Sequence, residues 1–66
     1  MNININGQVK NVPEGATLRD VVLKFAQRPE LVLTELNGAI VDRAKWADAS
    51  MASGDRVELV AFVGGG

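Results

Sequence analysis

Two Asn-Gly dipeptides constrain the fold of this chain more than any other feature of its sequence. Asn6-Gly7 follows a stretch in which isoleucines alternate with asparagines, and Asn37-Gly38 lies between the short apolar segments 31–36 and 39–41. Asn-Gly is the strongest short-range signal for a two-residue type I′ turn, because both central residues must adopt positive φ. The sequence therefore predicts two β-hairpins, the first over residues 1–12 and the second over residues 31–41.

One clear helix is predicted between the two hairpins. It carries an apolar stripe with the spacing i, i+3, i+4 and i+7, made of Leu18, Val21, Val22 and Phe25. Thr17 can cap the first turn, and Asp20 completes a capping box with Asp in place of the usual Glu. The pair Arg28-Pro29 is expected to end this helix, because the residue before a proline disfavours the helical conformation.

The last third of the chain indicates a helical turn, a loop and a strand. Residues 42–47 are expected to form a short helical turn with Trp46 folded inward. Ser53-Gly54-Asp55 has the composition of a turn. In the strand that follows, one face carries Val57, Leu59, Ala61 and Val63, and the other carries Arg56, Glu58, Val60 and Phe62. This order predicts an α+β fold with one main helix across a mixed four- to five-stranded sheet, and the last strand central beside the first.

Composition narrows the classes of function. The 66 residues make one domain, expected to span residues 1–63, with residues 64–66 as a flexible tail. Cysteine and histidine are absent, which removes the usual nucleophile, general base and metal ligands, so we expect a protein that is not an enzyme, with no bound cofactor or metal. Seven scattered basic residues against eight acidic ones argue against nucleic acid, and no apolar run suits a membrane. A cytoplasmic location is the expectation.

The chain ends in Gly64-Gly65-Gly66, and these glycines direct attention to the terminal carboxylate. Three extended residues reach at most about 10 Å, and glycine has no Cβ to clash in a narrow cleft. The Gly66 carboxylate resists nucleophilic attack until it is activated, and the chain has no phosphate-cradling loop for that step. Activation must therefore come from another protein.

The chain resembles the ThiS family, the ubiquitin-like β-grasp sulfur carriers of thiamine (thiazole) biosynthesis. The resemblance covers essentially the whole length and rests on Leu36-Asn37-Gly38, on Ile40-Val41 followed by Arg43 and Trp46, and on segments 54–58 and 62–66. It implies that an E1-like, ThiF-type enzyme uses ATP to adenylate Gly66. A sulfur donor protein would then supply sulfur for a C-terminal thiocarboxylate, and a ThiG-type thiazole synthase would accept it.

The resemblance also implies roles for residues near the end of the chain. Gly66 would bear the thiocarboxylate, Gly64 and Gly65 would thread the partners' active sites, and Val60 with Phe62 would touch the partners' surfaces. The alternative for Val60 and Phe62 is that loops or a side helix cover them.

The remaining candidates have simpler explanations. Trp46 is expected to anchor the core rather than to recognise a partner, and Met51 to fill a gap. Arg43 pairs either with an acidic partner or with Asp42 or Glu58.

Three other functions fit the same features. A molybdopterin-synthase-type sulfur carrier and a ubiquitin-like modifier of lysines would both use an activated Gly66. A non-covalent β-grasp interaction module would not use it, and its binding would survive deletion of Gly65 and Gly66.

Overall fold

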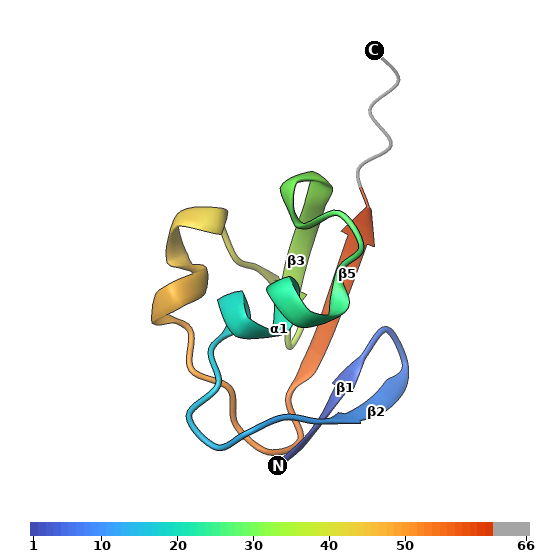
Figure 1. Ribbon diagram of the computed structural model, residues 1–66, viewed down its shortest axis with the longest axis vertical. Coiled ribbons are helices and arrows are strands. Elements are labelled where there is room, and N and C mark those ends of the chain that lie inside the picture. Colours follow the sequence, from blue (N-terminus) through green and yellow to red (C-terminus); the bar gives the residue numbers. More distant parts are fainter. Residues whose placement is uncertain (62–66) are drawn as a thin grey trace.

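The computed structural model describes residues 1–61, which form a five-stranded mixed sheet with one α-helix across one face (Figure 1). The elements are β1 (Asn2–Ile5), β2 (Gln8–Asn11), α1 (Leu18–Phe25), the 3₁₀ turn η1 (Pro29–Leu31), β3 (Val32–Leu36), β4 (Ala39–Ile40), the 3₁₀ segment η2 (Arg43–Asp48) and β5 (Arg56–Ala61). The strand order is β2-β1-β5-β3-β4, and β1 runs parallel to β5. The predicted α+β class, the single main helix and the central last strand are confirmed.

Both predicted hairpins are present, and their turns have the expected backbone geometry. Asn6 and Gly7 have φ of 50° and 84°, and Asn37 and Gly38 have φ of 52° and 88°. Asparagine tolerates the left-handed region better than other residues with a Cβ, and glycine enters it freely. Each turn joins neighbouring antiparallel strands, β1 to β2 and β3 to β4.

The helix begins where the sequence predicts and ends earlier. Thr17 Oγ1 accepts a hydrogen bond from Asp20 N (3.2 Å), and Asp20 Oδ2 accepts one from Thr17 N (2.9 Å), which confirms the capping box. The prediction that Arg28-Pro29 ends the helix is wrong, because α1 ends at Phe25 and Ala26 is already extended. The chain uses residues 26–28 to turn into η1, where Pro29 occupies the first helical position, before β3 begins.

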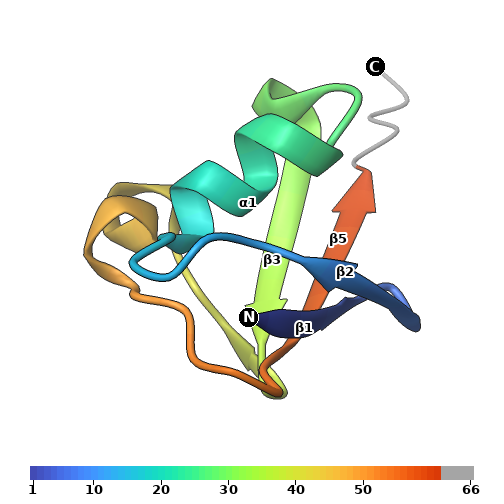
Figure 2. The same ribbon diagram turned by 60° about the horizontal axis from the view of Figure 1, so that its bottom comes forward.

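The core lies between α1 and the covered face of the sheet (Figure 2). Its most deeply buried side chains are Ile3, Leu18, Val21, Val22, Thr34 and Val57. Trp46 is 5% exposed and Met51 is 7% exposed, so both are core residues as expected. Among residues 1–61, no helix has the length and apolar character needed to cross a membrane.

Candidate functional site

The described part of the predicted site is the end of β5. Val60 lies on this strand, one residue before the strand ends at Ala61. The other residues with predicted roles, Phe62, Gly64, Gly65 and Gly66, lie outside the described residues. Their roles in partner contact, threading and sulfur attachment stay predictions.

Val60 is exposed on the face of the sheet that α1 does not cover. Its side chain is 48% exposed and lies directly opposite Leu33 of β3, which is 47% exposed. On the adjacent strand β4, Ile40 is 69% exposed and pairs with Glu35, two residues from Leu33 on the same face. We call Leu33, Ile40 and Val60 the sheet-face patch. For Val60, the alternative that loops or a side helix cover it is wrong among residues 1–61.

Two carboxylates border the sheet-face patch. Glu35 of β3 and Glu58 of β5 form a directly opposed cross-strand pair on the same face. Like charges in this arrangement destabilise a sheet. The described residues provide neither carboxylate with an ion pair, so a basic group from another molecule would relieve this repulsion.

A groove of about 360 Å³ lies on the other side of the β5 end. Phe25 and Ala26 from the end of α1, Leu31 from η1, and Leu59 and Ala61 from β5 supply its apolar lining. Asn6 and Arg28 add polar groups. The last described residues of β5 are therefore bordered by apolar surface on both faces of the sheet.

The two asparagines of the hairpin turns also bind β5, which the turn pattern did not predict. Asn6 Oδ1 accepts a hydrogen bond from Leu59 N (2.8 Å), and Asn6 Nδ2 donates one to Leu59 O (3.2 Å). Asn37 Oδ1 accepts from Arg56 N (2.9 Å), and Asn37 Nδ2 donates to Asp55 Oδ1 (3.0 Å). The only sequence signal for these bonds is the choice of asparagine rather than glycine at the first turn position.

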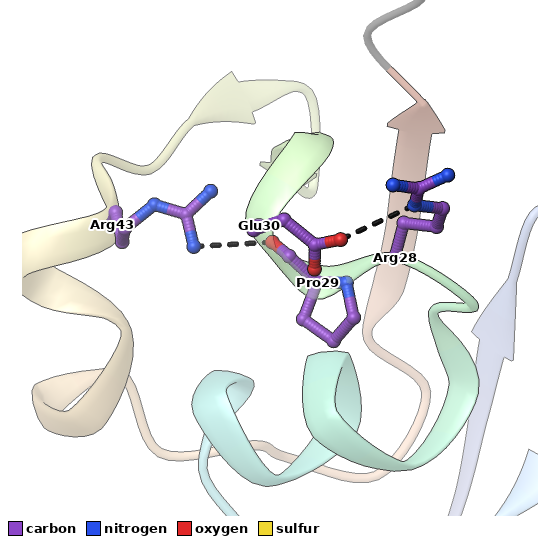
Figure 3. A network of polar contacts seen from close by, with 4 residues as sticks. All are labelled: Arg28, Pro29, Glu30 and Arg43. Carbon is purple, nitrogen blue, oxygen red and sulfur yellow. Dashed lines mark hydrogen bonds and ion pairs between the residues drawn. The ribbon is translucent and has the colours of Figure 1, made fainter.

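Arg43 connects η2 to η1 (Figure 3). Its Nη1 donates a hydrogen bond to Pro29 O (3.1 Å), and its guanidinium lies 4.5 Å from the centre of the Trp46 ring. The predicted pairing of Arg43 with Asp42 or Glu58 is therefore wrong, because stacking on Trp46 turns the guanidinium toward η1. An acidic partner for Arg43 stays a prediction.

The ion pair in the same network is exposed (Figure 3). Arg28 Nε lies 3.2 Å from Glu30 Oε1, with both side chains more than half exposed. The pKa of Glu30 is lowered, first by a hydrogen bond from its own backbone N–H and then by Arg28. Exposed pairs of this kind contribute little to stability.

The described residues at the end of β5 present an exposed apolar patch. Among residues 1–61, no three side chains of the types that ligate metals come together. What this region offers chemically is an apolar patch edged by carboxylates, at the end of the strand that leads to Gly66 in the sequence.

Comparisons with known proteins point in one direction. The model of the ThiS family matches residues 3–66. The crystal structure of a thiamine biosynthesis protein (ThiS) from Geobacter metallireducens matches this fold with a TM-score of 0.82 and 36% sequence identity, over the full length of both chains. The sulfur carrier protein ThiS of Bacillus subtilis is 28% identical over 97% of this chain and 98% of its own.

A thiazole synthase of Magnetococcus marinus is 35% identical over the whole of this chain, and the match covers 20% of that protein. The chain thus spans about a fifth of the length of that curated relative.

Proposed function

The chain belongs to the ThiS family of sulfur carriers of thiamine biosynthesis, and we propose that it bears its sulfur as a thiocarboxylate on Gly66. The observation that carries this proposal is the family match, which extends through the terminal glycines to residue 66. In a chain without cysteine, the carbonyl of Gly66 is the place where sulfur can be held in an acyl form.

The chemistry divides between this chain and an activating partner. In an E1-like enzyme, the Gly66 carboxylate attacks the α-phosphorus of ATP and pyrophosphate leaves, which gives a mixed anhydride. Hydrosulfide supplied by a donor protein then attacks the Gly66 carbonyl and AMP leaves, which gives the thiocarboxylate. The chain contributes the carboxylate, its backbone and the surface that brings it to the enzyme.

The sheet-face patch is the proposed docking surface for these partners. It combines exposed apolar side chains with the opposed carboxylates of Glu35 and Glu58, so a partner with a basic residue beside an apolar one would complement it. Phe62 would extend this surface toward the terminus. Binding here leaves Gly64 and Gly65 to enter the partner's active site.

The proposed acceptor of the sulfur is a ThiG-type thiazole synthase. In the Magnetococcus marinus relative, a segment similar to this chain is part of a protein named thiazole synthase. A carrier and its acceptor act on the same atom, so their presence in one chain supports a direct transfer between them. Here the transfer would occur between separate proteins or between parts of a longer one.

Intact-mass spectrometry tests the proposal. The protein is incubated with the E1-like enzyme, ATP and sulfide, and we expect a mass gain of one oxygen-to-sulfur exchange that maps to Gly66. A variant without Gly65 and Gly66 is the control and should gain nothing. A consistent absence of the exchange in the full chain would contradict the proposal, and adducts on lysines would indicate a protein modifier instead.

A further inference from the structure

The strand β1 ends before its neighbour β5 does. β1 pairs with β5 through Asn4↔Arg56 and Ile5↔Val57, and the chain then turns away at Asn6. The main-chain bond from Asn6 N to Val57 O (2.9 Å) comes at this point. On its other side, β5 stays paired with β3 as far as Ala61. The end of β5 is therefore paired with a neighbouring strand along one edge only.

The side chain of Asn6 supplies the missing support on the β1 side. It bonds both backbone groups of Leu59, accepting from its N–H at 2.8 Å and donating to its C=O at 3.2 Å. A primary amide carries the same donor and acceptor pair as a peptide group. Asn6 thus continues the ladder beyond the last residue of β1, across 53 residues of sequence.

Asn37 makes a comparable connection at the opposite end of β5. It has nearly the same φ as Asn6, 52° against 50°, and its side chain binds the N–H of Arg56, the first residue of the strand. Asn6 instead binds Leu59, two residues before the strand ends. Asn6 and Asn37 occupy the same position of the same turn type, and both form hydrogen bonds with β5. They bind opposite ends of that strand.

From this difference we infer that Asn6 is a positioning residue for the activation of Gly66, an assignment that rests on the proposed function. By holding Leu59 against the β1 side, Asn6 fixes the direction in which β5 leaves the sheet. Gly66 follows Ala61 by five residues in the sequence, so on this assignment the end of β5 sets the point and direction from which the carboxylate is delivered to a partner. Small errors in such alignment slow a reaction strongly even when binding is intact.

The substitutions Asn6→Gly and Asn37→Gly test this role as a matched pair. Glycine keeps the positive φ that each turn requires and removes only the amide. With the E1-like enzyme and ATP, we expect Asn6→Gly to lower kcat for adenylation about tenfold with KM nearly unchanged, because the sheet-face patch is intact. Asn37→Gly should keep the wild-type kcat. Backbone hydrogen exchange should accelerate at Leu59 in the first variant and at Arg56 in the second.

The outcomes separate the positioning role from general stability and from the proposed function. A wild-type kcat for Asn6→Gly, or an equal loss in Asn37→Gly, overturns the assignment. If Asn6→Gly unfolds more readily than Asn37→Gly, then Asn6→Asp replaces it. Asn6→Asp keeps an acceptor for Leu59 N but places a carboxylate beside Leu59 O, which repels it. We expect the same loss of kcat in this variant. A wild-type kcat for Asn6→Asp would also overturn the positioning role. A wild-type chain that the enzyme does not adenylate overturns the proposed function itself.

Discussion

At the scale of single residues, Thr34 shows how this small core accommodates a polar group. Its side chain is 1% exposed, its hydroxyl donates to Val41 O at 2.9 Å, and it accepts from Trp46 Nε1 at 2.9 Å. Trp46 Nε1 has a second, longer bond to Val41 O at 3.3 Å. The hydroxyl therefore satisfies the indole N–H that burial of Trp46 brings into the core.

We expect Thr34→Val to lower the free energy of unfolding by about 1–3 kcal/mol, because the buried indole N–H loses its shorter bond. Urea unfolding followed by far-UV circular dichroism measures this loss, because that signal is also present in variants without Trp46. A double-mutant cycle with Trp46→Phe is the control, since the cost of Thr34→Val should shrink once the indole donor is gone. Equal costs in both backgrounds would show that the hydrogen bond contributes nothing.

At the scale of elements, the capping box of α1 makes part of the stability depend on pH. The pKa of Asp20 is lowered from its usual value of 3.8, first by the hydrogen bond from the backbone N–H of Thr17 and then by the Thr17 side chain. A carboxyl group with a lowered pKa in the folded state stabilises the fold above its unfolded pKa. That contribution disappears as the pH falls through the lowered value.

Asp20→Asn should therefore flatten the acid limb of the stability profile. The asparagine keeps an acceptor for Thr17 N but has no charge to lose. Its free energy of unfolding should therefore fall less than that of the wild type as the pH drops below about 5. Urea midpoints across this range measure the difference. Thr17→Ala serves as the comparison, because it keeps the carboxylate of Asp20 and should retain an acid-sensitive stability. An acid limb for Asp20→Asn as steep as the wild-type limb would contradict the linkage.

Local sequence signals predicted most helices and strands. The features that they did not predict depend on contacts between residues distant in sequence. The Asn6-Gly7 turn follows from two residues, whereas the bonds from Asn6 to Leu59 depend on how β1 and β5 align in the sheet. The early end of α1 reflects the path needed to place η1 before β3, which the restriction at Pro29 alone does not reveal. Leu33 was not predicted as part of the sheet-face patch for the same reason, because strand pairing places it beside Val60.

At the scale of the whole molecule, the sheet has one face that α1 buries and one face that is open. The helix α1 lies across the first face (Figure 2). The second face carries the sheet-face patch together with Glu35 and Glu58. This separation means that substitutions on the open face can change binding without loss of the core. On the proposed function, it would also separate docking, through the patch, from delivery of the carboxylate, through the end of β5.

Val60→Arg tests the docking face. The side chain is about half exposed, so the fold should tolerate arginine. An arginine here would repel the basic residue that we propose for the partner, so KM for the E1-like enzyme should rise about tenfold with kcat nearly unchanged. Val9→Arg is the matched control, because Val9 is also exposed on the open face but lies on β2, outside the patch. An unchanged KM for Val60→Arg, or an equal rise for Val9→Arg, would argue against docking through the patch.

Gly65→Val tests the delivery of the carboxylate. Valine adds a branched side chain where we expect the partner's channel to accept backbone alone, so adenylation measured by ATP–pyrophosphate exchange should nearly disappear. The substitution lies outside residues 1–61, so circular dichroism and the urea midpoint should match the wild type. Because the sheet-face patch is intact, the variant should still bind the enzyme and compete with the wild-type chain. Gly65→Ala, with a smaller side chain, should retain partial activity, whereas normal adenylation of Gly65→Val would refute the threading of the terminal glycines into the partner.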